Sequence, residues 1–336
     1  MISYTKQEAA LRMNDLGKAR GPFLFIIDYK QQQVYVENVD AVDPEDVLFD
    51  LNGFTNQTVN QSSRSGNLPL SDEKPFMWQP SSISLEEYAR SFRIVSDHIH
   101  AGNSYLVNLT CATPVRTDLS LREIYLRSQA MYKLWIKDRF VVFSPEIFVR
   151  ISEGSIYSYP MKGTIDASIP NARAHILNDP KESAEHATIV DLIRNDLSIV
   201  ATDVCVPRYR YIDELHTHTG CLLQVSSEIR GTLAEDWRSH IGDILFSLLP
   251  AGSITGAPKK KTQEIIAEAE TYERGFYTGV MGYFDGQTLD SAVMIRFLEQ
   301  VSDGSFLFKS GGGITSRSDL ESEYNEMKQK VYVPIY

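Results

Sequence analysis

Strand-like and helix-like segments follow one another irregularly along this chain of 336 residues, and their order strongly constrains the fold. A capping-box pattern at residues 84–87 opens a run of apolar residues at helical spacing, which Gly102 ends. Strand-like segments follow at 104–111, 134–136, 140–143 and 147–151. Because the regular alternation of a doubly wound parallel sheet is missing, we predict an α+β fold.

A chain of this length is expected to form either a large single domain or a core domain with a smaller appendage, here an N-terminal segment packed on the main domain. Residues 1–75 read as a short β-rich segment, with strands at 22–28 and 33–36, and residues 76–336 as the main domain. We expect a mobile loop at about 55–75, where Asn, Gln, Ser and Gly dominate. Further helices are expected at about 119–131, 179–200, 263–270 and 318–332, and further strands at 221–229, 277–284 and 292–298.

Composition excludes several classes of protein. A net charge of −11 argues against nucleic acid and against an anionic membrane surface, since both need a basic face. No stretch approaches the roughly 20 apolar residues of a membrane-spanning helix. The N-terminus lacks a signal pattern and the three cysteines are scattered, so we expect a cytoplasmic protein with reduced thiols. An anionic ligand would need locally placed Lys or Arg residues or a metal.

Two pairs of glutamates stand at helical i, i+3 spacing, Glu182 with Glu185 and Glu323 with Glu326. This spacing puts both acids of a pair on one helix face. On spacing alone a solvated surface is the favoured interpretation, and convergence of the pairs on Mg²⁺ is a minority hypothesis. The sequence His216-Thr217-His218 has no third ligand at zinc-like spacing, which favours a structural role.

Other segments suit an anion or a nucleophile. Lys162 has few acidic sequence neighbours and would become nucleophilic if partly buried, although a solvated loop lysine is preferred on these grounds alone. The small-residue loop 252–259 leads into a helix and presents backbone N–H groups, but lacks the spacing of a nucleotide P-loop. Gly311-Gly312-Gly313 allows a close backbone approach or forms a plain turn.

Six motifs, in this order, resemble those of the chorismate-utilising enzymes, a family that includes the anthranilate, aminodeoxychorismate, isochorismate and salicylate synthases. The similarity runs from about residue 84 to the C-terminus. The motifs are Asn108-Leu109-Thr110, Ser144-Pro145-Glu146, Pro160-Met161-Lys162-Gly163-Thr164, Ala184-Glu185-His186 with 191–197, residues 252–259, and Ser318-Asp319 through Glu326. The resemblance implies large antiparallel β-sheets in a sandwich-like core, with helices packed outside.

The resemblance also implies roles for particular residues. Glu185 and Glu326 would hold Mg²⁺ against the ring carboxylate of chorismate, with Glu182 and Glu323 beside them. Residues matching further substrate contacts are Tyr277 and Arg296, for the enolpyruvyl carboxylate, and Thr164, Thr255, Gly311 and Gly313. Gln224 stands where many members have histidine, and glutamine donates a hydrogen bond but carries no proton.

Two positions distinguish the members. Lys162 marks the aminodeoxychorismate synthases, since anthranilate synthases carry alanine there, and Leu106 occupies the position of the water-activating lysine of isochorismate and salicylate synthases. The implied reaction is amination of chorismate at C4, towards 4-aminobenzoate and folate. Ammonia would come from a separate glutamine amidotransferase subunit.

In the implied mechanism Lys162 attacks C2 while Glu146 protonates the departing C4 hydroxyl. This requires a lowered pKa for Lys162 and a Glu146 that is still protonated near neutrality. Lys162 disfavours anthranilate synthase and Leu106 disfavours isochorismate formation. The intact Lys162, Glu146 and acid pairs disfavour a non-catalytic chorismate-binding protein.

Overall fold

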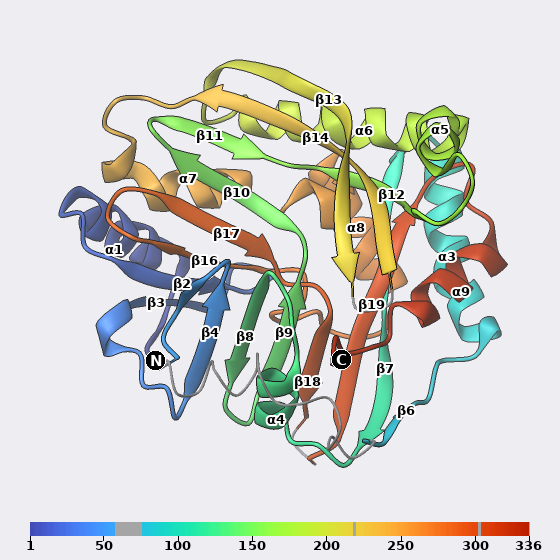
Figure 1. Cartoon of the computed structure of the whole chain (residues 1–336), viewed down its shortest axis with the longest axis horizontal. Helices are drawn as coiled ribbons and strands as arrows, with labels where there is room; N and C mark the ends of the chain where they lie inside the picture. Colours follow the sequence, from blue (N-terminus) through green and yellow to red (C-terminus); the bar gives the residue numbers. More distant parts are fainter. Residues whose placement is uncertain (58–75, 218–219, 302–303, 336) are drawn as a thin grey trace.

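Two antiparallel β-sheets lie face to face in the computed structural model, which describes residues 1–57, 76–217, 220–301 and 304–335 (Figure 1). Apolar side chains from both sheets meet between them, from β2 and β16 on one side and from β8 and β9 on the other. Alternating strands bury one face in this shared core, as a sandwich requires. The predicted α+β fold with large antiparallel sheets is confirmed.

The first sheet has ten strands among the described residues, with β13 (Thr202–Thr217) pairing beside β14. Its other strands lie in the order β1 (Ser3–Tyr4), β3 (Val34–Asn38), β2 (Phe23–Ile27), β16 (Val280–Phe284), β17 (Leu289–Val293), β10 (Ile147–Ser152), β11 (Ser155–Ser158), β14 (Gly220–Thr232) and β12 (Met161–Asp166). Residues far apart in the sequence are therefore neighbours, as where β16 pairs with β2.

The second sheet has nine strands in the same described ranges, with β6 (Trp78–Pro80) pairing beside β7. The others lie in the order β15 (Gly256–Ala257), β7 (Leu106–Thr117), β19 (Phe306–Ile314), β18 (Phe297–Gln300), β9 (Phe140–Ser144), β8 (Tyr132–Ile136), β4 (Val47–Leu51) and β5 (Phe54–Thr55). The long pairing of β7 with β19 runs through the glycine segment, so that Gly311 faces Thr110 and Gly313 faces Asn108.

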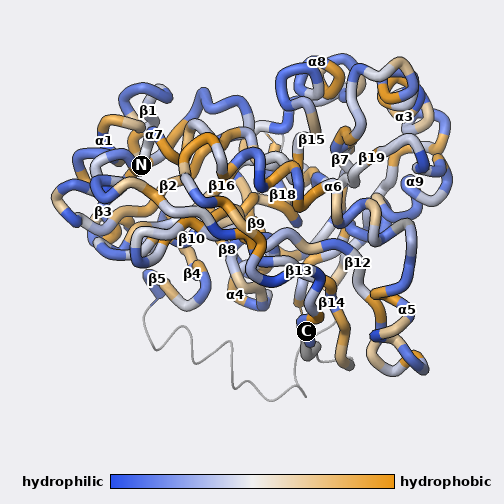
Figure 2. The backbone as a smooth tube through the Cα atoms, turned by 90° about the horizontal axis from the view of Figure 1, so that it is seen from above, coloured by the Kyte–Doolittle hydropathy of each residue, from blue (hydrophilic) through white to orange (hydrophobic). Residues whose placement is uncertain are grey.

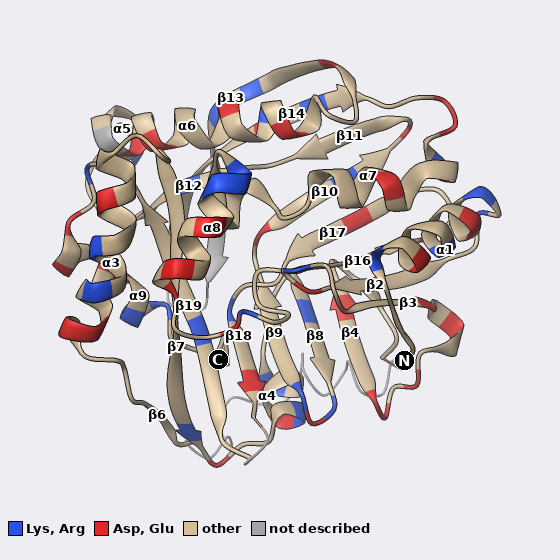
Figure 3. Ribbon diagram, turned by 180° about the vertical axis from the view of Figure 1, so that it is seen from behind, with Lys and Arg blue, Asp and Glu red and all other residues tan. Residues whose placement is uncertain are grey.

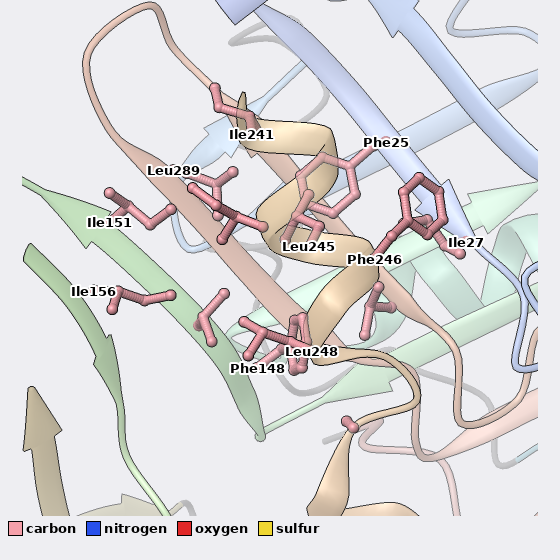
Figure 4. Packing of buried hydrophobic residues seen from close by; sticks show 14 of the residues in the cluster. Phe25, Ile27, Phe148, Ile151, Ile156, Ile241, Leu245, Phe246, Leu248 and Leu289 are labelled. Carbon is pink, nitrogen blue, oxygen red and sulfur yellow. The ribbon is translucent and has the colours of Figure 1, made fainter. Parts of the chain in front are cut away.

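The helices cover the outer faces of the sheets. They are α1 (Lys6–Lys18), α3 (Leu85–His100), α4 (Leu121–Arg127), α5 (Ala172–Asn178), α6 (Pro180–Leu197), α7 (Ile241–Leu248), α8 (Lys259–Ala269) and α9 (Leu320–Gln329), with short 3₁₀ turns η1 (Val39–Ala41), η2 (Trp237–His240) and η3 (Gly252–Ile254). Helices α3, α8 and α9 pack on β7 and β19 around one apolar cluster. Helix α7 packs on the first sheet, where Leu245 and Phe246 meet Phe25 and Ile27 of β2 (Figure 4).

Hydropathy and charge follow this layering. Apolar segments lie along inner strands such as β9 and β16, and hydrophilic segments along α1 and α3 (Figure 2). Both acidic and basic residues lie on these outer helices, whereas the inner strands carry few charges (Figure 3). Among the described residues no helix is both long and apolar enough to span a membrane.

The N-terminal region, predicted to be β-rich, contains strands β1 to β5 and also the helix α1 at residues 6–18, which was not predicted. Thr5 caps this helix in a capping box with Glu8, and only Ala9, Met13 and Gly17 are buried. Such a narrow apolar stripe gives little periodic signal. The strands of the region join both sheets, β2 and β3 the first and β4 and β5 the second. The mobile loop predicted at 55–75 falls almost wholly outside the described residues, and so does His218.

Candidate active site

A cavity of about 810 Å³ lies between the two sheets, beside α6 and α9. Strands β10, β12 and β14 of the first sheet and β7 and β19 of the second contribute to its walls. The predicted site residues that line it are Glu146, Lys162, Thr164, Glu182, Glu185, Gln224, Tyr277, Arg296, Gly311, Gly313 and Glu326. The fold thus brings together residues that are up to 180 positions apart, counting from Glu146 to Glu326.

Two predicted residues do not line the cavity. Thr255 is fully buried beside Tyr29, because the turn η3 directs it inward; its backbone oxygen accepts from Asn108 N at 3.0 Å. Its side chain is therefore not part of the cavity wall, and its contact with substrate stays a prediction. Glu323 is 7% exposed on α9, and its Oε2 lies 3.6 Å from the position of a Cβ added to Gly312. A Glu326 oxygen lies at the same distance from that position, so the two carboxylates of α9 lie on the same side of Gly312.

Lys162 forms an ion pair with Glu185 across the gap between β12 and α6. The distance from Lys162 Nζ to Glu185 Oε2 is 2.7 Å. Burial lowers the pKa of Lys162, but the carboxylates of Glu185, Glu326 and Glu182 together raise it more, so the net pKa is above its usual value. Because the ion pair stabilises the ammonium form, this direction is opposite to the one that the implied mechanism requires with Mg²⁺ bound. The lowered pKa in the metal-bound site stays a prediction.

Glu146 sits in the short link between β9 and β10, and Ser253 donates a hydrogen bond to its Oε1. Burial raises the pKa of Glu146, while the Ser253 hydrogen bond and the charges of Arg296 and Lys330 lower it by less. The direction agrees with the expectation of a carboxyl group that holds its proton near neutrality. The backbone N–H of Glu146 donates to Ser144 Oγ at 3.0 Å and fixes the link.

Tyr277 and Arg296 form another part of the wall. Tyr277 is 3% exposed, and burial raises the pKa of its phenol, so that it remains a hydrogen-bond donor. Arg296 has a left-handed backbone (φ 54°) between β17 and β18, and its guanidinium lies over the Tyr332 ring. Within the described part of the chain Arg296 Nε is buried and makes no hydrogen bond. An arginine fork with a vacant donor suits a carboxylate.

The glycine segment brings backbone close to the cavity. A Cβ on Gly311 would lie 2.3 Å from Leu109 O, so no larger residue fits between β19 and β7. The Gly311 carbonyl accepts from Lys330 Nζ at 2.8 Å, and the same ammonium lies 2.7 Å from Glu326. Thr164 and Gln224 face each other in the pairing of β12 with β14. Leu106 also lines the cavity and offers no base.

Several cavity residues had no role in the sequence predictions. Ser253 bonds to Glu146, and Lys330 pairs with Glu326 and also acts on Glu146 through its charge. Asn108 donates from its side chain to Ile254 O at 2.9 Å. Asp196 pairs with Lys259 at 2.9 Å behind the turn η3. Lys330 follows Glu326 at i, i+4 spacing, so this pair could have been predicted from the sequence. The other contacts join residues that only the fold brings together.

Carboxylate groups of the cavity could hold a metal ion. In residues 1–57, 76–217, 220–301 and 304–335, no three His, Cys, Asp or Glu side chains lie close enough to hold an ion together. Glu182 and Glu185 of α6 and Glu326 of α9 line the cavity and offer hard carboxylate oxygens. This set fits Mg²⁺, which is usually held by one or two carboxylates, waters and an anionic substrate.

The chain has an α+β fold, and acidic, basic and backbone groups line its cavity. Residues 14–335 match the family model of the chorismate binding enzymes, and the chain therefore belongs to this family of enzymes.

Two curated relatives and one solved structure show the range of similarity. A protein of Haemophilus influenzae named an uncharacterized PabA-like protein is 47% identical over 100% of this chain and 99% of its own length. Aminodeoxychorismate synthase component 1 of Klebsiella aerogenes is 30% identical over 97% of this chain and 71% of its own length. Anthranilate synthase component I of Streptococcus pneumoniae has the same fold, with a TM-score of 0.70 at 20% identity over 95% of this chain and 84% of its own.

Proposed function

We propose that this chain aminates chorismate at C4 with ammonia and forms 4-amino-4-deoxychorismate. The observation that carries the proposal is the position of Lys162, whose ammonium nitrogen faces the cavity beside Glu185. A lysine there serves as a nucleophile, whereas the leucine at 106 leaves no base to activate water. Similarity to the Klebsiella aminodeoxychorismate synthase over 97% of this chain supports the choice.

Chorismate carries two carboxylates, and the cavity offers a site for each. Arg296 and Tyr277 are proposed to bind the enolpyruvyl carboxylate by a guanidinium and a phenol donor. Glu185 and Glu326 would hold a Mg²⁺ ion that grips the ring carboxylate. The metal would supply positive charge that the acidic wall lacks. With its carboxylate engaged in holding the ion, Glu185 would stabilise the ammonium form of Lys162 less, so that the amine can lose a proton.

The proposed covalent step balances as follows. The lone pair of neutral Lys162 Nζ forms a bond to C2, the ring double bonds shift, and the C4–O bond breaks as Glu146 transfers its proton to the departing hydroxyl, which leaves as water. Ammonia then forms a bond to C4, the double bonds shift back, and the C2–N bond to Lys162 breaks. The proton lost by the incoming nitrogen returns to Glu146.

Ammonia is proposed to come from a separate glutamine amidotransferase subunit. Free ammonium salt near pH 8 replaces that subunit in a test of this chain alone. The proposed location is the cytoplasm, where the three free cysteines would stay reduced.

The test is product identification by mass spectrometry after incubation with chorismate, Mg²⁺ and ammonium salt, with and without an added aminodeoxychorismate lyase. We expect aminodeoxychorismate alone and 4-aminobenzoate with the lyase. Anthranilate as the product would mean that chorismate is aminated at C2 and not at C4. Isochorismate would show that the chain activates water without a lysine at position 106. Binding of chorismate without turnover in ammonia would leave a binding protein as the better description.

A further inference from the structure

Arg274 is a fully buried cation that lies outside the cavity wall. Its side chain is 2% exposed, and every one of its five N–H donors has a partner. Nε and Nη2 donate to Glu270 at 2.8 and 2.6 Å, Nη2 also to Asn108 O at 2.7 Å, and Nη1 to Ile254 O at 3.0 Å and Thr278 Oγ1 at 3.3 Å. One planar group thus joins its own link between α8 and β16 to Asn108 on β7 and to Ile254 in η3.

Glu270, the C-cap residue directly after α8, is also held by several hydrogen bonds. Its Oε1 accepts from the backbone N–H and the hydroxyl of Thr110 on β7, at 2.9 and 2.7 Å. A buried ion pair is weak evidence for stability, because apolar side chains of similar volume in its place often give a protein that is equally stable or more stable. The five-donor pattern therefore requires a reason other than stability alone.

The carbonyls that Arg274 holds belong to the wall of the cavity. Asn108 and Ile254 both line it, and the Asn108 side chain donates to the same Ile254 oxygen. Ile254 follows Ser253, whose hydroxyl donates to Glu146 Oε1. A contact path therefore runs from Arg274 through Ile254 O and Ser253 to the carboxyl group of Glu146.

We propose that Arg274, clamped by Glu270, is a positioning residue that holds the turn at Ser253 against Glu146. The proposal rests on the proposed role of Glu146 as the acid. Reacting groups need placement within fractions of an ångström, and a displacement of about 1 Å can cost on the order of 100-fold in rate. A fixed guanidinium provides such placement without touching the substrate.

The test variant is Arg274→Lys, which keeps the charge but replaces the planar fork by a point donor that cannot hold Glu270 and both carbonyls. We expect kcat for chorismate consumption to fall about 30- to 100-fold with KM changed less than about threefold. The matched control is Arg150→Lys. Arg150 pairs with Asp290 at 3.0 Å and does not line the cavity, so this variant should keep at least half of the activity.

Two further readouts separate positioning from loss of stability. Hydrogen exchange of the backbone at 252–256 should accelerate about tenfold in Arg274→Lys and in Glu270→Gln but not in Arg150→Lys. Ser253→Ala should lower kcat, and Arg274→Lys combined with Ser253→Ala should lose little more than the worse single variant, because both act on one contact path.

The outcomes are distinct. Unchanged exchange at 252–256, additive losses in the double variant, or equal losses in Arg274→Lys and Arg150→Lys would each overturn the proposal. Chorismate consumption is followed whatever product forms, so a wild-type product other than aminodeoxychorismate would refute the proposed function while the comparison of variants still decides the role of Arg274. If the wild type consumed no chorismate, hydrogen exchange would still decide whether Arg274 holds the turn.

Discussion

Lys162 and Glu185 lie 2.7 Å apart on different elements, and this pair is the chemical centre of the proposed mechanism. Lys162→Ala removes the nucleophile, and Lys162→Arg keeps the cation and its pairing but replaces the amine by a guanidinium that does not lose its proton. Both variants should lose at least about 100-fold in aminodeoxychorismate formation, measured by mass spectrometry. Unchanged circular dichroism spectra serve as the folding control. Near-wild-type product from Lys162→Ala would remove the covalent step.

Glu146 links catalysis to stability through its raised pKa. Because its folded pKa lies above the unfolded value, its contribution to stability is fully present below the unfolded pKa of about 4.3 and is lost as pH rises through the folded pKa. Glu146→Gln has no titrating group at this position, so the variant does not lose this stability as the pH rises. Relative to the wild type, the variant should gain thermal stability at about pH 8 and gain less at about pH 4, with roughly 2–4 °C in Tm for each kcal/mol.

The same variant should be inactive, since glutamine cannot give a proton, with a loss of about 10²- to 10⁴-fold. Glu235→Gln, at an exposed position, is the control and should change neither the activity nor the pH dependence of Tm. If Glu146→Gln changed Tm equally at both pH values, the folded and unfolded pKa values of Glu146 would be the same, and the carboxyl group would be ionised near neutrality. The pH dependence of Tm thus tests the protonation of Glu146 independently of any turnover.

Strand β12 and helix α6 meet closely at Gly163, next to the proposed nucleophile. Gly163 has φ 84°, and an added Cβ would lie 3.0 Å from Glu182 Oε2 and 3.5 Å from Ile176. Gly154, in the turn between β10 and β11, has φ 73° with no atom within 4 Å of an added Cβ. The two glycines share the left-handed backbone but not the crowding.

Alanine at each glycine should therefore cost about 1–2 kcal/mol of folding free energy from backbone strain, measured by urea denaturation. Only Gly163→Ala should also lower kcat/KM, by about tenfold or more, because its methyl group presses on α6 beside Glu185. Equal activities in the two variants would show that the spacing of β12 and α6 is not critical.

Glu185 and Glu326 lie on helices that pack against different sheets. A ligand bound to both residues should therefore connect the two sheets. Mg²⁺ with chorismate should raise Tm, since a ligand at about 100 times its Kd stabilises the folded state by about 2.7 kcal/mol. Glu185→Gln and Glu326→Gln should abolish the part of the shift that depends on Mg²⁺. Glu321→Gln, exposed on the same helix as Glu326, is the control. A full shift in EDTA would exclude the metal.

The sequence by itself determined the local features of this protein. Capping boxes and apolar periodicity are properties of neighbouring residues, so α3, α6 and α9 and several strands were predictable, as was the α+β class. The order of six motifs was enough for the family, and of the thirteen residues that the resemblance implied for the site, all except Thr255 and Glu323 line the cavity. Helix α1 was missed, since only Ala9, Met13 and Gly17 of it are buried.

Only the tertiary structure decided what depends on contacts between distant residues. Ser253 reaches Glu146 across 107 positions, Arg274 reaches Asn108 across 166, and Thr255 turns into the core although its motif suggested the cavity. The pKa direction of Lys162 likewise follows from Glu185, which a neighbouring helix supplies. A sequence specifies these contacts through the whole fold, because burial and Coulomb energies depend on distances that no local pattern contains.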